Sequence, residues 1–452
     1  MISRRTFLQL SASFGMVAGL RQFELAATPA QADYKALVCV FLFGGNDGHN
    51  LVVPLNPTQY AAYTGARGGL AIAQNQLLPI NDAAQGPFGL HYGVPELQAL
   101  YNQGKMAIVS NVGMLVQPTS FQNLSNSSFP LPTQLRSHSD QVSQMQTGYP
   151  NTGGNSGWGG RSADLMQSSN AAATFPVSVS LNGAAIFCAG VSTPLASLQP
   201  GNYMTQNGMN AYPAAASAAR ASAQQTIATT DSGNSIINLA NKAMADAITL
   251  SPMLVNAGSG STLTTVFPGT QLGNQLRDIV RIISLRAQTG VGRQVFFCGL
   301  GGFDTHSSQS YNQYDLLQQV SKAVSAFYAA TVELGVADKV TTFTLSDFGR
   351  TLQPSGTGTD HGWGNHHLVV GGAVSGGRII GAFPQMTAYS TIGQANSTQQ
   401  DFADNRGTML PRLSLAQYGA TLAKWFGAAD PQLDSVFPTL SGFAARDLGF
   451  ML

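Results

Sequence analysis

The chain has 452 residues, of which 44% are hydrophobic and only 10% are charged, and its formal net charge is +1. The hydrophobic content excludes an intrinsically disordered chain and is sufficient for a large buried core. A net charge near zero, without a cluster of Lys or Arg, excludes the basic footprint of a nucleic-acid-binding protein.

The N-terminus has the layout of an export signal. Arg4 and Arg5 precede a moderately apolar run over residues 8–20, and residues 30–32 (AQA) have the form of a cleavage site. The adjacent arginines indicate the twin-arginine (Tat) route, so the Tat translocase is an expected transient partner. The apolar run is too short, and too rich in Ser and Gly, to span a bilayer. We therefore predict that residues 1–32 are a Tat signal peptide and that the mature protein is periplasmic or secreted, with an uncleaved membrane anchor as the alternative.

Strand signals open the mature chain. Residues 36–43 are a continuous apolar run, typical of a strand buried on both faces. Another strand is predicted at 106–110, and shorter strands are predicted at 176–180 and 185–188. The three cysteines lie in apolar, strand-like runs and are interpreted as core residues without disulfides or metal, namely Cys39, Cys188 and Cys298.

Residues 200–270 differ from the rest of the chain because they are rich in Ala, Ser, Gln and Thr. Helices are predicted at 213–227 and 232–250, followed by a flexible break at 258–261. We interpret this region as a helical insertion in a single domain that spans residues 33–452.

The clearest alternation of helices and strands follows the insertion. Apolar periodicity predicts helices at 271–287 and 311–334, and buried strands are predicted at 295–300 and 340–345. Alternating helices and apolar strands favour an α/β fold with a mostly parallel central sheet and helices on both faces.

Acidic and His-bearing loops follow three of the predicted strands. These loops cover residues 44–49, 301–306 and 346–350, and a fourth His-rich segment covers 360–367. Ligands of open parallel sheets bind outside the carboxyl ends of the strands. Four of the seven histidines lie between positions 306 and 367. Carboxylates and imidazoles at one sheet edge suit Zn²⁺, or Mn²⁺ and harder ions if oxygen ligands dominate.

Each of these residues also has a simpler explanation. Three aspartates can be turn or helix-cap residues, namely Asp47, Asp304 and Asp347. His49 fits a loop position better than a ligand position, and adjacent residues such as His366 and His367 seldom face one site. His91 and His138 stand apart in the sequence and have weaker claims as ligands.

Four segments together resemble a large family of uncharacterised Tat-exported bacterial proteins that is grouped with the alkaline phosphatase and sulfatase superfamily. The segments cover residues 41–48, 301–306, 346–351 and 360–367, and the similarity extends to 157–161 and 418–423. The resemblance implies an alkaline-phosphatase-like sandwich. It also implies a site with two divalent metal ions that holds a phosphate or sulfate ester against a Ser, Thr or Cys nucleophile.

The resemblance also implies a set of metal ligands. They are Asp47 after the first strand, the central pair Asp304 and His306, Asp347 and His361 on one metal, and His366 on the other. Zn²⁺ is the expected ion, with Mn²⁺, Mg²⁺ and Ca²⁺ as alternatives. The sequence departs from the superfamily pattern, because one residue separates Asp304 from His306 and Phe348 follows Asp347 where a His is usual. These departures leave open the number of metals and the division of ligands between them.

The nucleophile has the weakest sequence signal, because the sulfatase motif Cys/Ser-x-Pro-x-Arg is absent. Ser137 is the best candidate, since it would open a helix whose N-terminus favours an anionic substrate, and a metal could activate its hydroxyl. Its spacing to Asp140 also fits a capping box. Arg350 is the candidate for a bidentate contact to an ester oxygen.

Three classes of function are compatible with these residues. The first is a periplasmic metal-dependent hydrolase of phosphate or sulfate esters, with a small or carbohydrate-linked substrate. The alternative is a metal-containing, non-catalytic binding or assembly protein of the cell envelope. A third possibility is a surface protein that acts on polysaccharide, which the low charge and polar neutral composition would suit.

Overall fold

The computed structural model describes residues 33–452 except for 152, 202–211, several positions between 235 and 250, 256–262 and 392–400. The predicted signal peptide and the predicted break at 258–261 lie outside the described residues, and the helix predicted at 232–250 is described only in part.

A nine-stranded sheet forms the centre of the molecule, in the order β13-β5-β12-β9-β1-β8-β6-β7, with β14 also paired to β5. Its strands are β1 (Lys35–Leu42), β5 (Met106–Gly113), β6 (Ser178–Ser180), β7 (Ala196–Ser197), β8 (Arg293–Leu300), β9 (Val340–Ser346), β12 (Asn365–Gly371), β13 (Ile379–Ile380) and β14 (Leu413–Ser414). The central strand β1 runs parallel to both β8 and β9, and β12 is antiparallel to its two neighbours. The predicted α/β fold with a mostly parallel sheet is confirmed.

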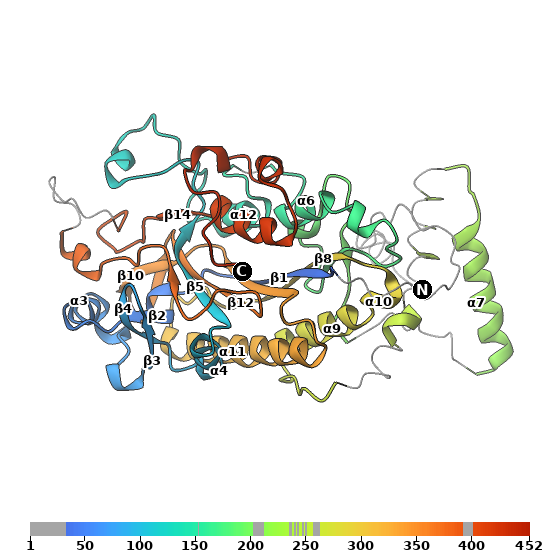
Figure 1. Cartoon of the computed structure of the whole chain (residues 1–452), viewed down its shortest axis with the longest axis horizontal. Helices are drawn as coiled ribbons and strands as arrows, with labels where there is room; N and C mark the ends of the chain where they lie inside the picture. The colour runs from blue at the N-terminus through green and yellow to red at the C-terminus, as the bar shows by residue number, and fades with distance from the viewer. Residues whose placement is uncertain are drawn as a thin grey trace.

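Helices cover both faces of this sheet (Figure 1). The α-helices whose bounds are described are α2 (Gly48–Leu51), α3 (Pro57–Arg67), α4 (Pro95–Asn102), α5 (His138–Thr147), α6 (Trp158–Asp164), α7 (Ala214–Thr229), α9 (Gln271–Ser284), α10 (Arg286–Thr289), α11 (Gln309–Glu333), α12 (Leu415–Phe426) and α13 (Leu433–Val436). Helices α4, α9 and α11 lie on one face, and α6 and α12 lie on the other (Figure 1).

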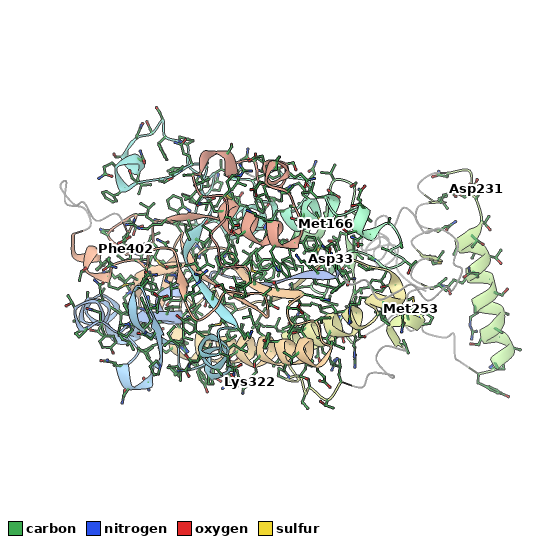
Figure 2. All side chains as sticks on the ribbon, viewed as in Figure 1. Asp33, Met166, Asp231, Met253, Lys322 and Phe402 are labelled. Atoms are coloured by element: carbon green, nitrogen blue, oxygen red, sulfur yellow. The ribbon has the colours of Figure 1, made fainter. Side chains whose placement is uncertain are left out.

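The alternation of side chains along β1 builds one core on each face of the sheet. Val38 packs in the cluster that contains Leu276 of α9 and Leu317 of α11. Leu37 packs in the opposite cluster, with Trp158 of α6 and Leu422 of α12. Successive residues of a strand point to opposite faces, so a strand covered on both faces must be apolar throughout, as the sequence of β1 is. Side chains fill the space between the sheet and both helical layers (Figure 2).

The shorter predictions had mixed outcomes. The helix predicted at 213–227 is α7, which stands away from the sheet at one end of the molecule (Figure 1). The strand predicted at 185–188 is wrong, because Ile186–Cys188 is a 3₁₀-helix. Its apolar character reflects burial, since Phe187 and Cys188 are inaccessible to solvent. The three cysteines are free and buried, as predicted.

Two smaller sheets lie beside the main one. Strands β2 (Val52–Pro54), β4 (Gly86–Leu90) and β3 (Leu78–Asp82) form one of them, and the hairpin of β10 (Arg350–Ser355) and β11 (Gly358–His361) forms the other. The hairpin follows β9 directly and ends in His361. It therefore connects the carboxyl edge of the main sheet to the His-rich segment.

Candidate metal centre

The loops that follow β1, β8 and β9 meet at one edge of the sheet because these three strands are parallel neighbours. Gly44 has a φ of +112°, and a Cβ atom at this position would lie 2.3 Å from the backbone nitrogen of Asp304. Gly358 of the hairpin also allows a close approach, since a Cβ atom at this position would lie 2.2 Å from the carbonyl oxygen of Thr305. Glycine thus allows the backbones that carry the polar side chains to approach closely.

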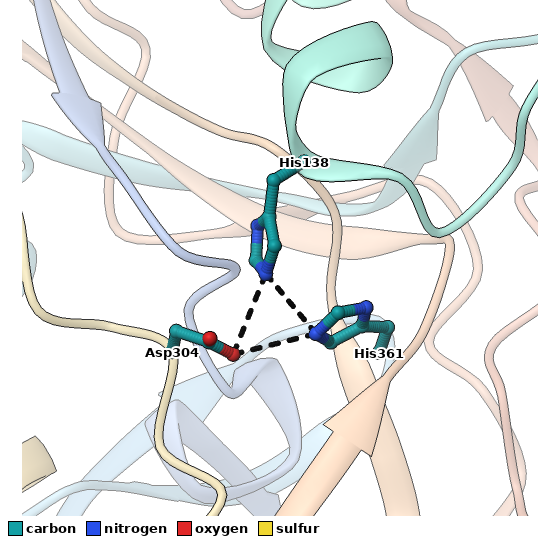
Figure 3. A group of neighbouring side chains, drawn as sticks. All are labelled: His138, Asp304 and His361. Carbon is teal, nitrogen blue, oxygen red and sulfur yellow. Dashed lines mark hydrogen bonds and ion pairs between the residues drawn. The ribbon is translucent and has the colours of Figure 1, made fainter.

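Three side chains from distant parts of the chain converge at this edge (Figure 3). They are His138 of α5, Asp304 of the loop after β8 and His361 at the end of β11. The Nε2 atoms of His138 and His361 are 3.0 Å apart. Asp304 Oδ1 lies 3.5 Å from Nε2 of His138 and 3.4 Å from Nε2 of His361. Among the described residues, this is the group whose ligand atoms could hold a metal ion.

His306 lies beside this group, in contact with two of its members. Its Nε2 atom lies 2.9 Å from Asp304 Oδ1 and 3.0 Å from Nε2 of His361. The side chains of Asp304 and His306 are 44% and 45% exposed, so the group opens to solvent on this side.

The ring of His138 is oriented by the loop after β9. Its Nδ1 atom lies 2.7 Å from Oδ2 of Asp347, and the other oxygen of Asp347 accepts a hydrogen bond from the backbone N–H of Gly44. Asp347 is itself almost inaccessible to solvent. A carboxylate accepts and cannot donate when ionised, so Nδ1 of His138 carries the proton and Nε2 presents a lone pair to the group.

The other two rings are oriented in the same way. Nδ1 of His361 lies 2.8 Å from the backbone carbonyl oxygen of Arg136, and Nδ1 of His306 lies 3.2 Å from Oδ1 of Asp360. The carbonyl oxygen of Arg136 accepts a hydrogen bond from Nδ1 of His361, and the Asp360 carboxylate is an ion-pair partner beside Nδ1 of His306. The Nε2 atoms of all three imidazoles lie within 3.5 Å of Oδ1 of Asp304, and a bound metal would take their lone pairs when the protons sit on Nδ1. Such an outer partner on the remote nitrogen is the usual companion of a metal-bound histidine.

The pKa values of the group are shifted from their usual values in different directions. The hydrogen bond to Asp347 raises the pKa of His138 above its usual value, against the opposing effect of burial. Burial lowers the pKa of His361, more than its bond to the Arg136 carbonyl raises it. Burial alone would raise the pKa of Asp304, but Arg350 and the neighbouring histidines outweigh burial and keep it below its usual value. Asp304 and His361 are thus held in the forms that bind metals, which are carboxylate and neutral imidazole.

Arg350 connects the loops beneath the group. Its Nη1 donates to the carbonyl oxygen of Gly44 at 2.8 Å and to Oδ1 of Asp304 at 3.1 Å, while Nε and Nη2 donate to Thr359. The guanidinium group is buried, and every one of its nitrogens donates within the protein. Its predicted contact with an ester oxygen stays a prediction.

Asp47 lies at the same sheet edge, but its carboxylate points to a different set of partners. It is buried, forms an ion pair with Arg67 of α3, and accepts hydrogen bonds from Gln309 and from the backbone N–H of His49. In the described part of the chain these contacts make Asp47 the N-cap of α2 and one half of a buried ion pair. Its role as a metal ligand stays a prediction.

His366 is buried on β12. Its Nδ1 atom accepts from the backbone N–H of Asn111 at 3.1 Å, and its ring stacks on Phe383 with centroids 4.7 Å apart. Burial lowers its pKa far below the usual value. It has no contact with Asp304 or His361 among the described interactions, and its assignment to a second metal also stays a prediction.

His138 is the member of the group that the sequence interpretation ranked low. It begins α5, far in sequence from the strand-end loops, and its neighbour Ser137 is the N-cap residue of this helix. The hydroxyl of Ser137 does not cap the helix; it bonds to the carboxylate of Asp140 and lies 3.3 Å from the hydroxyl of Ser139. The sequence feature that could have identified His138 as part of the site is its position directly after the candidate nucleophile Ser137.

Two of the four non-glycine residues with a positive φ in the described part of the chain lie beside the group. Arg136 and Ser308 have positive φ angles of 73° and 50°, which non-glycine residues seldom adopt. Arg136 presents its carbonyl oxygen to His361, and Ser308 stands between His306 and the start of α11. Strained residues held by their surroundings occur preferentially at functional sites.

Together, the fold and the site define an α/β protein with a partly exposed His/Asp group at the carboxyl edge of its sheet. The chain belongs to the family described as "Protein of unknown function (DUF1501)", whose model matches residues 34–410. The family expected from the sequence motifs is thereby confirmed. No curated protein matches the chain.

Two solved structures show distant similarity. One is Ps i-CgsB in complex with k-i-k-neocarrahexaose, with 11% identity, 88% of this chain and 74% of that chain covered, and a TM-score of 0.36. The other is the PsFucS1 sulfatase from Pseudoalteromonas sp., with 12% identity, 90% and 78% of the two chains covered, and a TM-score of 0.31. These similarities are too distant to assign an activity to this chain.

No helix in the described ranges combines the length and the apolar character needed to cross a membrane.

Proposed function

We propose that this chain is a metal-dependent hydrolase of phosphate or sulfate esters that binds one divalent transition-metal ion, preferably Zn²⁺, at His138, Asp304 and His361, with His306 beside them. The observation that carries the proposal is the common orientation of the three imidazoles. Their Nδ1 atoms are held by acceptors, so three Nε2 lone pairs and one carboxylate oxygen face each other. A metal ion would replace the proton shared between the Nε2 atoms of His138 and His361, which lie 3.0 Å apart, and would accept both lone pairs.

The distances also suit a metal. Ligand atoms about 2.0–2.1 Å from Zn²⁺ in a tetrahedron are separated by roughly 3.3 Å. The separations among His138, Asp304 and His361 run from 3.0 Å between the two Nε2 atoms to 3.5 Å between His138 and Asp304. Imidazole donors dominate the set, which favours Zn²⁺ over Mg²⁺ or Ca²⁺.

The local charge favours an anionic ligand once a metal is bound. Five charged groups surround the site: Asp304 pairs with Arg350, Asp360 pairs with Arg406, and Asp347 has His138 as its partner. Their charges sum to minus one, and a divalent cation changes the sum to plus one. A bound metal supplies Lewis-acid polarisation of an ester oxygen and lowers the pKa of a hydroxyl or water.

The protein's own residues would hold the ester against this site. Ser137 precedes a ligand directly and lies at the N-terminus of α5, where backbone N–H groups and the helix dipole favour an anion. Asp140, bonded to the hydroxyl of Ser137, is positioned to accept its proton. Ser137 is therefore our proposed nucleophile. Carbohydrate-linked esters are included in the proposed substrates because the site is open to solvent.

One observation favours the non-catalytic alternative. Catalytic zinc sites keep three protein ligands and an open position, whereas structural sites close with four. If His306 binds the metal together with the other three residues, the set is closed, and the protein would be a metal-containing binding or assembly protein of the cell envelope. If His306 stays off the metal, His138, Asp304 and His361 leave a position for substrate.

The test combines elemental analysis with an ester screen on the mature protein. We expect one zinc per chain, and hydrolysis of at least one phosphate or sulfate ester. His361→Ala should lose both metal and activity, and Ser137→Ala should lose activity but keep the metal. His91→Asn is the control, since His91 lies outside the group and Asn can still accept from the backbone N–H of Gly93. Zinc without turnover supports the binding-protein alternative, and wild-type protein without affinity for any divalent metal refutes both functions.

A further inference from the structure

A loop that none of the sequence motifs includes connects to the proposed ligand His361 and to His306 beside it. The loop covers residues 403–408 and is closed by a hydrogen bond from the N–H of Ala403 to the carbonyl oxygen of Thr408, at 2.7 Å. The carboxylate of Asp404 organises it by accepting from the N–H groups of Arg406 and Thr408, at 3.0 and 3.2 Å. We call it the Asp404 loop.

The first connection leads to His306. The guanidinium group of Arg406 forms an ion pair with Oδ2 of Asp360, and Oδ1 of the same carboxylate lies 3.2 Å from Nδ1 of His306. Arg406 thus fixes the carboxylate that orients the ring.

The second connection leads to His361. The other oxygen of Asp404 forms an ion pair with the guanidinium group of Arg136, whose carbonyl oxygen accepts from Nδ1 of His361. Arg136 has a left-handed backbone, so an anchor on its side chain helps to hold the strained carbonyl toward the ring.

The loop itself is tied to the hairpin that carries both Asp360 and His361. The N–H groups of Leu352 and Gln353 on β10 donate to the carbonyl oxygens of Gly407 and Arg406, at 3.1 and 2.9 Å. One small loop therefore reaches two ligand rings through separate partners while resting on the element that supports them.

We propose that the Asp404 loop is a clamp that fixes the rings of His306 and His361 through Asp360 and Arg136 and thereby sets the metal affinity of the site. Asp404 and Arg406 are positioning residues that do not touch the metal. The proposal rests on the proposed metal site. Partners on the remote nitrogen of a ligating histidine change metal affinity about 10–100-fold, whereas exposed ion pairs contribute little to folding stability. The clamp should therefore affect metal binding far more than folding.

The experiment measures Zn²⁺ affinity of the mature protein by competition with a chromophoric chelator, and records the visible spectrum of the Co²⁺-loaded protein. Arg406→Ala and Asp404→Asn should each weaken Zn²⁺ binding by up to about 10–100-fold, the effect of removing a direct partner of the ring, and change the Co²⁺ spectrum, with unchanged urea midpoints for the metal-free proteins. Arg406→Lys should restore part of the affinity. Arg412→Ala is the matched control, because Arg412 pairs with Asp401 in the same segment and should bind Zn²⁺ as the wild type does.

A double-mutant cycle identifies the route. In a His306→Ala background, Arg406→Ala should cause no further loss, because the ring that it positions is gone. Wild-type affinity in Arg406→Ala and Asp404→Asn would overturn the clamp while leaving the metal site intact, and so would an equal loss in Arg412→Ala. A wild-type protein that binds no metal would overturn the proposed function itself.

Discussion

Replacing Asp347 by Asn tests the orientation of His138 with a change of one atom. In the native protein, Oδ2 of Asp347 accepts from Nδ1 of His138 at 2.7 Å, while Oδ1 accepts from the N–H of Gly44 at 3.1 Å. The carbonyl oxygen of Asn can keep the bond to Gly44, but its NH₂ group then faces Nδ1. A donor at this position favours the other tautomer, with the proton on Nε2, and His138 no longer offers a lone pair to the metal.

The expected loss follows from this single bond. Removal of a partner on the remote nitrogen of a ligand histidine weakens metal binding about 10–100-fold, which equals about 1.4–2.7 kcal/mol. At free Zn²⁺ of one hundred times the wild-type Kd, bound metal stabilises the wild type by about 2.7 kcal/mol and the variant by only about 0.4–1.4 kcal/mol. The variant also loses the main cause of the raised pKa of His138. A lower pKa reduces the competition between protons and Zn²⁺, which would by itself raise the affinity. A measured loss of affinity would therefore come from the orientation of the ring.

The assay is a Zn²⁺ competition titration at neutral pH, with thermal unfolding measured at matched free Zn²⁺. Asp315→Asn is the control, because it removes an equal charge from the exposed surface of α11. We expect the control to behave as the wild type. An Asp347→Asn protein with wild-type Zn²⁺ affinity and a normal metal-dependent rise in Tm would refute the assignment of His138 as an oriented ligand.

Three further predictions concern stability and export. Burial lowers the pKa values of His91 and His367 to about 3, so below pH 6.5 the unfolded chain binds protons that the folded chain does not. Each residue should then reduce the free energy of unfolding by about 1.4 kcal/mol for each pH unit below 6.5. In His91→Asn, the free energy of unfolding measured with urea should fall less steeply with decreasing pH than in the wild type, and an equal dependence on pH would contradict this. Arg67→Ala leaves Asp47 buried without its ion-pair partner and should destabilise the fold by about 3–5 kcal/mol, measured by urea unfolding; a loss below 1 kcal/mol, about that of an exposed pair, would show that the pair is not buried in solution. Changing the arginines at positions 4 and 5 to lysine should retain the precursor in the cytoplasm, as judged by fractionation, and normal export would exclude the Tat route.

The sequence by itself determined the sheet and one edge of the site. The runs that became β1, β8 and β9 are apolar throughout because both faces of the sheet are covered, and this signal is local. Parallel neighbours end at the same edge, so the loops bearing Asp304 and Asp347 could be placed together before their contacts were known. The same reasoning failed at 185–188, where an apolar run marked burial of a 3₁₀-helix.

Only the tertiary structure decided which side chains of those loops face one another. His138 joins the group from a helix with no link in sequence to the strand ends, and its aim depends on Asp347 more than two hundred positions away. Asp47, like Asp304, follows a buried strand in a glycine-rich loop, yet its carboxylate forms an ion pair with Arg67 of α3 instead of joining the group. The composition of a loop determines which side chains are available to bind a metal. The direction in which each side chain points is set by long-range hydrogen bonds and ion pairs. These contacts form when distant segments pack together, so they leave no pattern in the local sequence.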